Sequence, residues 1–405
     1  MFAVSAGIGT RAEVVNHAEV LEANYGNAVI RPMSGTLHAL PWATNGKYRV
    51  GEVLCESCWM PPYRDGVPQG ACTRYVARTQ LKRLSELGYQ LMSGFEAEFF
   101  MYRKDGIGAV TDRPMFKGID IFSSLILAEH DEVICSMYDS LSGAGVDVAT
   151  LQTEYGPGQL EFATGTKFGV ESADQMFTLK EAVKEIGVQH GWIATFMTRP
   201  ADKQGCSSGM HFSGSLWADG KNVFHNPESA RQLSAVGRHW AAGLIKHAGA
   251  MTALVCPTVN CYRRLHGPFA PDRANCGFEN RSAMVRVVAS SPQMTYIENR
   301  LPSSAANPYL VLAATVAAGI DGLVNRLELP SGDTEEGRGE MLASSLSEAL
   351  LALESDKVLC EALGEELIRW FVSVKRQVEI AKMAKAKETT QDELEVEREM
   401  YFTFL

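Results

Sequence analysis

The stretch GFEAEFF, residues 94–100, places two glutamates, Glu96 and Glu98, inside an otherwise apolar run. Side chains two residues apart in a strand point to the same face of a sheet, so this pattern predicts a strand with both carboxylates on one face. Two neighbouring carboxylates repel each other, and burying an unpaired one is costly. We therefore expect this face of the strand to hold cations.

The composition is that of an ordinary globular chain, with 46% hydrophobic and 21% charged residues over 405 positions. That length suffices for one large core or for two or three average domains. Asp and Glu number 48 against 38 Lys and Arg, and the net charge of −10 disfavours nucleic acid or an anionic membrane as the main partner. The longest apolar stretch, 308–323, is too short and too rich in Ala and Gly to predict a membrane span.

The nine cysteines are scattered, and the N-terminal residues lack the basic segment of a secretory signal. This pattern is typical of reduced thiols in the cytosol, so we expect a cytoplasmic protein. Cys55 and Cys58 form a C-x-x-C pair. Because no second pair follows at zinc spacing, a metal or redox role for this pair is the weaker alternative.

Apolar periodicity and capping signals predict helices and strands in mixed order. Residues 74–87 have helical spacing, Ser172 and Gln175 resemble a capping box for a helix through Val183, and Asn226-Pro227 is expected to start a long helix toward Met251. Residues 31–42 and 331–340 are expected to be loops, and helices dominate from 306 onward. Besides the strand around GFEAEFF, the predicted strands are 148–153, 158–163, 191–196, 209–216, 283–289 and 294–300. This mixture predicts an α+β fold with an antiparallel sheet.

Four of these strand-like segments carry acids or a histidine among apolar or small residues. Taken singly, each has a plain structural explanation, such as an exposed edge strand, a turn, a core histidine or a surface ion pair. Taken together, five carboxylates and one imidazole would repel unless cations lay between them, and such ligands suit Mg²⁺ or Mn²⁺. Two such ions can clamp phosphoryl oxygens. The residues are Glu96, Glu98, Glu154, Glu161, His211 and Glu298.

A second set of candidate residues is basic. Arginine side chains form bidentate hydrogen bonds with carboxylates and phosphates, and these arginines lie in segments built mainly of apolar and small residues. Surface ion pairs are the alternative. The set comprises Arg263, Arg264, Arg281, Arg286 and Arg300.

The ordered motifs GFEAEFF, E-x-x-PGQ-x-E, GMH-x-x-x-SLW, PTVN-x-YRRL, ENRSA-x-x-R, IENR and ANPYLVLAA resemble glutamine synthetase of the class I type, from about residue 30 onward. The stretches ATVAAGIDGL and ALGEELIRWFV are most similar to the lengsin branch of that family. The resemblance implies a catalytic domain over 43–405, in which a curved antiparallel sheet forms a funnel backed by helices. It also implies that 1–42 is a remnant of the N-terminal region and linker, with the family's β-grasp domain largely missing.

The resemblance also assigns roles to residues. Glu98, Glu154 and Glu161 match the ligands of the metal near the amino-acid substrate, and Glu96, His211 and Glu298 match those of the metal that holds the transferred phosphate. Arg264 and Arg300 match the arginines at the glutamate carboxylate and γ-phosphate, whereas Ser215, Arg281 and Arg286 match the nucleotide side. Arg281 and Arg300 are the catalytic candidates. The implied cofactors are two Mg²⁺ or Mn²⁺ ions, with ATP, glutamate and ammonia or an organic amine as substrates.

Several positions depart from the family pattern. The loop LHGPFAP, residues 265–271, lacks the glutamate that takes a proton from ammonium in the family, and a general base contributes about a hundred- to ten-thousand-fold to rate. The other departures are Cys206 and Ser207 near the glutamate position, Ser213 in place of a second histidine, and Gln293 and Tyr296 in place of basic residues.

These departures leave three hypotheses open: a scaffold or pseudoenzyme with weak or no ligation, an active γ-glutamyl ligase that uses ammonia or an amine, and a binding sensor without turnover. The resemblance further implies a homo-oligomer of stacked rings, similar to a dodecamer. The apolar residues Tyr401, Phe402, Phe404 and Leu405 are expected to dock on the opposite ring.

Overall fold

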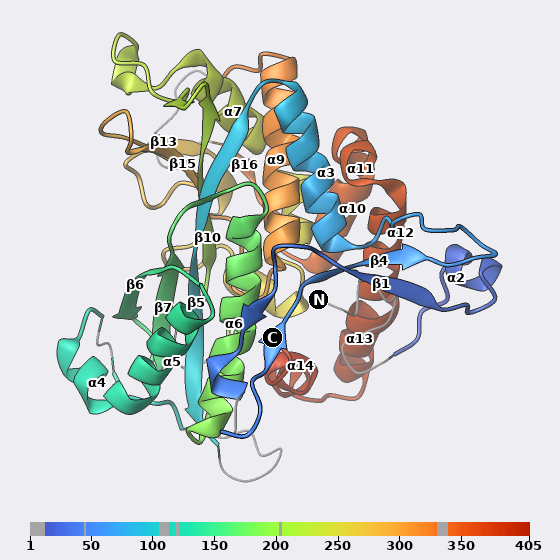
Figure 1. Ribbon diagram of the computed structural model, residues 1–405, viewed down its shortest axis with the longest axis vertical. Coiled ribbons are helices and arrows are strands. Elements are labelled where there is room, and N and C mark those ends of the chain that lie inside the picture. The colour runs from blue at the N-terminus through green and yellow to red at the C-terminus, as the bar shows by residue number, and fades with distance from the viewer. Residues whose placement is uncertain (1–12, 44–45, 105–112, 119–120, 202–204, 330–338) are drawn as a thin grey trace.

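The structure is a computed structural model, and it describes residues 13–43, 46–104, 113–118, 121–201, 205–329 and 339–405. Within these ranges, none of the helices has the length and apolar character needed to cross a bilayer. One ten-stranded sheet and the helices packed against it make up most of the molecule (Figure 1).

The large sheet has the strand order β13-β14-β15-β10-β5-β7-β6, and β8, β9 and β11 pair at its margins. All of its pairs are antiparallel except β13 with β14, which is parallel, so the predicted antiparallel sheet is confirmed with one exception. The strands are β5 (Gln90–Arg103), β6 (Val148–Thr153), β7 (Gln159–Thr164), β8 (Lys167–Phe168), β9 (Trp192–Thr195), β10 (Met210–Ala218), β11 (Lys221–Asn222), β13 (Cys276–Phe278), β14 (Val285–Ala289) and β15 (Thr295–Asn299).

Strand β5 is the centre of this sheet, because it pairs with β7, β8, β9 and β10 along its 14 residues. Its side chains alternate as the sequence predicts: Phe95, Ala97 and Phe99 are buried in the main core, whereas Glu96 and Glu98 on the other face are only partly buried. The two faces of one strand thus separate the hydrophobic core from the acidic residues.

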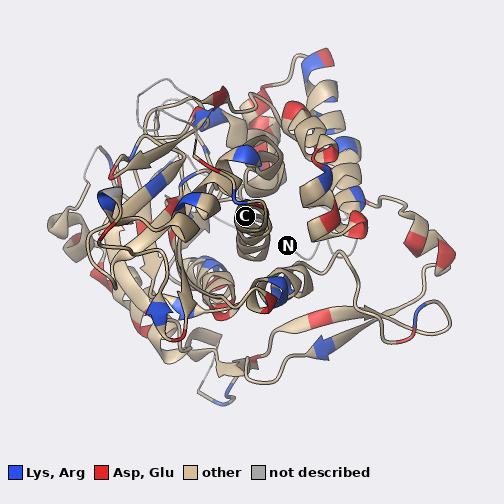
Figure 2. Ribbon diagram, turned by 90° about the horizontal axis from the view of Figure 1, so that it is seen from above, with Lys and Arg blue, Asp and Glu red and all other residues tan. Residues whose placement is uncertain are grey.

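The helices pack along one side of the sheet and extend beyond it (Figure 1). Helix α9 packs against α3, α6, α7 and α8, which makes it the central helix of this layer. Figure 2 shows basic and acidic residues interspersed along the C-terminal helices. The helices are α2 (Ala18–Glu22), α3 (Thr73–Glu86), α4 (Ser124–Glu129), α5 (Asp131–Gly143), α6 (Glu171–Gln189), α7 (Ala235–Lys246), α8 (Ala248–Val255), α9 (Pro308–Val324), α10 (Leu346–Ser355), α11 (Lys357–Leu363), α12 (Glu365–Val374), α13 (Ala381–Glu388) and α14 (Glu393–Tyr401).

Three two-stranded sheets complete the described strands. They are β1 (Ala28–Pro32) with β4 (Cys55–Trp59), β2 (His38–Ala39) with β3 (Gly51–Glu52), and β12 (Arg273–Ala274) with β16 (Glu340–Met341). The β1–β4 pair extends away from the large sheet together with α2 (Figure 1). The predicted loop at 31–42 therefore contains the end of β1 and all of β2, and the predicted loop at 331–340 lies outside the described residues up to 338.

Most predicted elements are confirmed within two residues at either end, including the helix at 74–87 and all six further strands. The capping box is wrong. Helix α6 begins at Glu171, so Ser172 lies in its first turn, where its hydroxyl forms a 2.8 Å hydrogen bond with the Ser93 hydroxyl. The Gln175 side chain accepts a hydrogen bond from the Asp147 backbone N–H instead of capping the helix.

The long helix expected from Asn226 to Met251 is also wrong. The Asn226 side chain accepts a hydrogen bond from the Glu228 backbone N–H, which forms a local turn instead of a helix start. Helix α7 begins after Ser234, whose hydroxyl accepts from the Gly237 N–H at 3.1 Å. The chain then breaks at His247, so the segment forms two helices, α7 and α8.

The apolar C-terminal residues pack largely within their own chain. Tyr401 and Phe402 are fully buried, and the Phe402 ring lies 5.2 Å from that of Tyr102 at the end of β5. The backbone N–H of Phe196 donates to the Leu405 carbonyl at 3.0 Å, whereas Phe404 is 46% exposed. Tyr401 and Phe402 therefore bury their side chains without another subunit, contrary to the expectation that they dock on an opposite ring.

Candidate metal centre

Strand pairing brings six candidate residues to the acidic face of the sheet. In the β5–β7 register Glu98 lies opposite Glu161, and in the β5–β10 register Glu96 lies opposite His211. These residues come from strands far apart in the sequence, and the turn after β6 and strand β15 add the last two. We call this set the carboxylate cluster: Glu96, Glu98, Glu154, Glu161, His211 and Glu298.

Three members of the carboxylate cluster are close enough to bind one ion. Glu96, His211 and Glu298 offer ligand atoms that all lie within 4.8 Å of one another. The His211 Nδ1 atom lies 3.4 Å from Glu298 Oε1 and 3.7 Å from Glu96 Oε2. Burial, followed by the charge of Arg300, lowers the pKa of His211 to about 3, so its imidazole is neutral at pH 7, which is the form that binds a metal.

The other three members are held by amide groups. The Gln152 side chain donates to Glu154 Oε1 at 3.0 Å and to Glu161 Oε1 at 2.8 Å, so one amide bridges two carboxylates. Glu98 Oε2 accepts from the Gln159 side chain at 2.9 Å and from the Gly209 backbone N–H at 3.2 Å. Among the described residues, these three glutamates do not form a group as compact as that of Glu96, His211 and Glu298.

The carboxylates raise one another's pKa values. Burial, followed by the charges of Glu98, Glu96, Glu154 and Glu298, raises the pKa of Glu161 to about 9. Burial and the charge of Glu154 raise the pKa of Glu98 to about 7, and burial also raises the pKa values of Glu96 and Glu154. Five acids in one low-dielectric region therefore lack sufficient positive charge when no cation is bound.

Two arginines form ion pairs with Glu298, and the charges of nearby arginines lower the pKa values of Glu96 and Glu98 by less than burial raises them. Arg300 Nη1 lies 2.7 Å from Glu298 Oε1, and Arg286 Nη1 lies 3.1 Å from Glu298 Oε2. Arg264 is buried, and two of its guanidinium nitrogens donate to the backbone carbonyls of Arg300 and Leu301 at 3.0 Å each. Arg264 therefore holds the segment after β15 in place.

The remaining predicted residues lie around this centre. Arg281 is exposed, and its charge lowers the pKa values of Glu96 and His211, which places it near both. Ser215 is buried in β10, and its hydroxyl accepts from the Trp217 indole N–H at 2.9 Å. Arg263 instead forms an ion pair with Glu397 at 2.8 Å, away from the carboxylate cluster.

The donor set fits a hard divalent cation. Carboxylate oxygens with one neutral imidazole are typical ligands of Mn²⁺ and Mg²⁺, and Glu96 is 41% exposed at the side chain, which leaves access to the group. The Cys55 and Cys58 thiols are free and do not belong to this group, which is the one metal-capable cluster among the described residues.

Sequence reasoning missed the residues that orient the carboxylates. Gln152 precedes Glu154 by two positions, and the β6–β7 register places it opposite Glu161; this same-face spacing could have identified it. Gly209 leaves room for its neighbours: a Cβ atom there would lie 2.9 Å from Arg264 Nη2 and 3.2 Å from His211 Nε2. A side chain at this position would therefore require the Arg264 guanidinium to shift.

An aromatic pair lies beside the carboxylate cluster, and one of its rings comes from the loop where the family acid was expected. The rings of Tyr155 and Phe269 stack at 5.2 Å between centroids with an interplanar angle of 13°. Tyr155 directly follows Glu154, and its backbone N–H donates to Glu154 Oε2 at 3.3 Å. The loop 265–271 thus presents an apolar ring near the cluster, where an acid would have supplied a general base.

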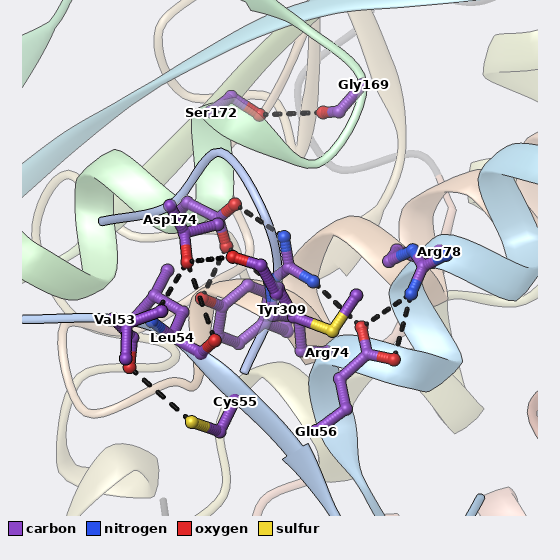
Figure 3. Close-up of polar contacts among 12 residues, drawn as sticks. Val53, Leu54, Cys55, Glu56, Arg74, Arg78, Gly169, Ser172, Asp174 and Tyr309 are labelled. Atoms are coloured by element: carbon purple, nitrogen blue, oxygen red, sulfur yellow. Dashed lines mark hydrogen bonds and ion pairs between the residues drawn. The ribbon is translucent and has the colours of Figure 1, made fainter. Parts of the chain in front are cut away.

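A second charged group lies on the helix side of the sheet. Arg74 in α3 donates to both Asp174 oxygens at 2.9 Å and to Glu56 Oε1 at 2.8 Å, and Arg78 also binds Glu56 (Figure 3). The Tyr309 hydroxyl of α9 donates to Asp174 Oδ1 at 2.6 Å. We call this set the arginine network: Glu56, Arg74, Arg78, Asp174 and Tyr309. It joins β4, α3, α6 and α9.

The glutamine synthetase catalytic domain profile matches residues 70–398. The chain belongs to the glutamine synthetase family. Its fold is that of the family's catalytic domain, as the sequence motifs predict.

Relatives support this assignment from two branches. The chain is 35% identical to lengsin of Canis lupus familiaris over 360 residues, which cover 86% of this chain and 60% of that protein. It is 34% identical to glutamine synthetase of Thermus thermophilus over 365 residues, which cover 86% of this chain and 80% of that one. Since the two identities are nearly equal, identity alone does not separate the lengsin branch from the enzymes.

A solved structure described as a GmaS/ADP complex has a TM-score of 0.77 and 29% identity, and the match covers 90% of this chain and 85% of that one. The chain spans about 60% of the length of the lengsin that it matches. The activity, substrates and partners of the whole protein are therefore treated below as proposals.

Proposed function

We propose that this chain is a divalent-cation-binding member of the glutamine synthetase family that ligates ammonia to glutamate weakly or not at all and acts as an oligomeric scaffold or binding protein. The observation that carries the proposal is the closeness of Glu96, His211 and Glu298, whose ligand atoms lie within 4.8 Å. These three residues would hold one Mg²⁺ or Mn²⁺ ion. Glu98, Glu154 and Glu161 would hold a second. When bound, such ions neutralise charge on phosphoryl oxygens.

The proposed loss of ammonia ligation rests on the loop 265–271. Phe269 is 72% exposed in this loop, and no acid in the loop can take a proton from ammonium. Arg300 and Arg281 remain the groups proposed to act on a transferred phosphate, with Arg264 and Arg300 near glutamate. Ser215, Arg281 and Arg286 would contact ATP. Because Arg286 and Arg300 both bind Glu298, binding of an ion at Glu298 would release part of their charge for phosphate.

A second candidate function is an active ATP-dependent γ-glutamyl–amine ligase. The stacked Tyr155 and Phe269 rings favour it, because they provide an apolar surface that ammonia cannot use but an organic amine can. A neutral amine also needs no acid to deprotonate it. Residual activity is therefore expected to favour amines over ammonia and to rise with pH as the amine loses its proton.

We further propose a homo-oligomer of stacked rings in the cytoplasm, with 43–405 as the catalytic domain. The support is the family itself and the nine free cysteines, which suit a reducing compartment. Light scattering of the purified chain checks the assembly, and a monomer at micromolar concentration would contradict it.

The activity proposal is tested by phosphate release with ATP, glutamate and Mg²⁺, in parallel reactions with ammonia and with a panel of primary amines. We expect release with ammonia to be near background. Robust glutamine formation at neutral pH would contradict the scaffold proposal. Phosphate release that depends on one amine would favour the γ-glutamyl–amine ligase over the scaffold. Glu96→Gln should abolish that release.

A further inference from the structure

The Tyr155–Phe269 pair joins two separate loops beside the carboxylate cluster. Phe269 is 72% exposed and has a left-handed backbone with φ of 61°, and Tyr155 is 38% exposed. A bulky residue rarely adopts this backbone conformation, and strained residues concentrate at ligand sites. His266 in the same loop is also left-handed, with φ of 65°.

The loop that carries Phe269 is anchored close to the centre. It follows Arg264, which is 4% exposed and fixed by two backbone carbonyls, and Leu265, which is also buried. The Gly267 N–H donates to the Arg264 carbonyl, and the Ala270 N–H donates to the Gly267 carbonyl, so one turn precedes Phe269 and a second contains it. The ring is therefore presented by a defined turn with most of its surface in solvent.

The neighbourhood of this pair has a definite charge. Glu154 directly precedes Tyr155. Glu154 and Glu161 both accept a hydrogen bond from the Gln152 side-chain amide. A ligand in contact with both rings and the nearest carboxylates would meet flat apolar surface on one side and negative charge on the other. Aromatic rings also attract cations through their faces. An ammonium group attached to a flat apolar group matches both parts.

We propose that Tyr155 and Phe269 form the subsite for the apolar group of a primary amine whose ammonium group faces Glu154. The ligand class is arylalkyl amines, and ammonia is excluded because it is too small to contact the rings. The inference rests on the proposed function only in taking this centre as the binding site of the protein. It requires binding and does not require turnover.

The test uses the full chain with Mg²⁺ and three probes: 2-phenylethylamine, ethylamine, which lacks the ring, and 2-phenylethanol, which lacks the amine. Isothermal titration and ligand-observed NMR measure their affinities. We expect 2-phenylethylamine to bind more tightly than either probe that lacks the ring or the amine. Phe269→Ala should weaken 2-phenylethylamine about three- to tenfold, a range set by the value of one aromatic contact, and should leave ethylamine unchanged.

Controls separate recognition from loss of folding. Phe269→Tyr should retain binding because the ring remains, and Phe404→Ala, which removes an exposed phenyl from the tail, should have no effect. The proposal is overturned if Phe269→Ala affects both amines equally or neither, if 2-phenylethanol binds as tightly as the amine, or if no amine binds at tens of millimolar.

Mn²⁺ binding to metal-free samples of the same variants, followed by electron paramagnetic resonance, reports separately on the proposed function. Ring-dependent amine binding without Mn²⁺ binding would contradict the metal proposal and support this subsite. Mn²⁺ binding without ring-dependent amine binding would support the metal proposal and contradict this subsite.

Discussion

The carboxylate cluster and the arginine network both contain buried charges, yet the balance of positive and negative charge differs between them. In the arginine network, Arg74 and Arg78 face Glu56 and Asp174, so two positive charges meet two negative ones through short hydrogen bonds (Figure 3). The carboxylate cluster contains five glutamates and one neutral histidine, and Arg286 and Arg300 both bind the same glutamate, Glu298. The first group is complete by itself, whereas the second lacks counter-charge.

This difference indicates that the charges of the arginine network have a structural role, whereas those of the carboxylate cluster are suited to binding a cation. A buried ion pair with satisfied hydrogen bonds holds elements together, and removing one partner is costly because the other remains buried. Crowded carboxylates without counter-ions destabilise the protein that carries them, so their presence calls for another explanation. The comparison therefore predicts opposite responses to mutation in the two groups.

The largest effect is expected in the arginine network. Arg74→Met should lower the free energy of unfolding by about 3–5 kcal/mol, because it leaves Glu56 and Asp174 with less positive charge in a buried site. Urea denaturation measures this loss. Lys82→Met on the same helix is the control, since its pair with Glu86 is exposed and should contribute less than about 0.5 kcal/mol. Equal losses in both variants would contradict the structural role.

Cation binding should stabilise the second group. Mn²⁺ at a hundred times its dissociation constant should add about 2.7 kcal/mol to the free energy of unfolding, because the ion binds the native state. Thermal denaturation in EDTA and in excess Mn²⁺ measures the difference. Glu96→Gln should reduce the shift, and Glu86→Gln, at an exposed site on α3, should not. Identical midpoints in EDTA and Mn²⁺ would refute the metal centre.

Without metal, the carboxylate cluster should make stability depend on pH. The pKa of Glu161 is raised from 4.5 to about 9, so the native state favours its protonated form. Its contribution is fully present below about pH 4.5 and is lost as pH rises toward 9. Glu161→Gln should therefore raise the free energy of unfolding at pH 9 by about 2 kcal/mol in EDTA.

The measurement is urea denaturation of the metal-free protein at pH 6 and pH 9. Glu132→Gln, at a site where the side chain is 89% exposed, is the control and should follow the wild type. A Glu161→Gln variant with the same pH slope as the wild type would show that the carboxylates are compensated without metal.

The smallest effect is expected at His247, a balanced charge group between α7 and α8. Its Nδ1 and Nε2 atoms donate to Asp356 at 2.5 Å and to Asp321 at 3.0 Å. Burial lowers its pKa, but these hydrogen bonds outweigh burial and raise it overall. The stabilisation is therefore present below the unfolded pKa of about 6.5 and is lost as pH rises through the folded value.

The expected loss for wild type between pH 6 and pH 9 is about 1 kcal/mol, and His247→Gln should remove this pH dependence. Differential scanning calorimetry in excess Mn²⁺ measures this pH dependence, because bound Mn²⁺ should suppress the pH dependence that comes from the carboxylate cluster. If the variant keeps the wild-type slope, the histidine is not charged in the folded protein.

The alternation in GFEAEFF was enough to predict both faces of β5, because period two is a local property of the chain. Which strands lie beside β5 is not local, so the Gln152 bridge and the burial of Phe402 against Tyr102 required the structure. The capping box at Ser172 failed for a related reason: Ser93, distant in sequence, provides the hydroxyl partner. The cluster residues were predicted from the acids and the histidine in four strand-like segments, whereas the hydrogen bonds of Arg264 to two backbone carbonyls were not.

The central position of β5 has a consequence for how the protein folds. Its Glu98 contacts Gln159, 61 residues away, and Gly209, 111 residues away, so these contacts close long loops. Folding slows as the sequence separation of native contacts grows. The metal ligands meet only after β5, β7, β10 and β15 have all paired, so a cation cannot nucleate this sheet and can only trap it once formed. Metal binding followed during refolding would then report completion of the central sheet. It should appear later than the circular dichroism signal of the helices.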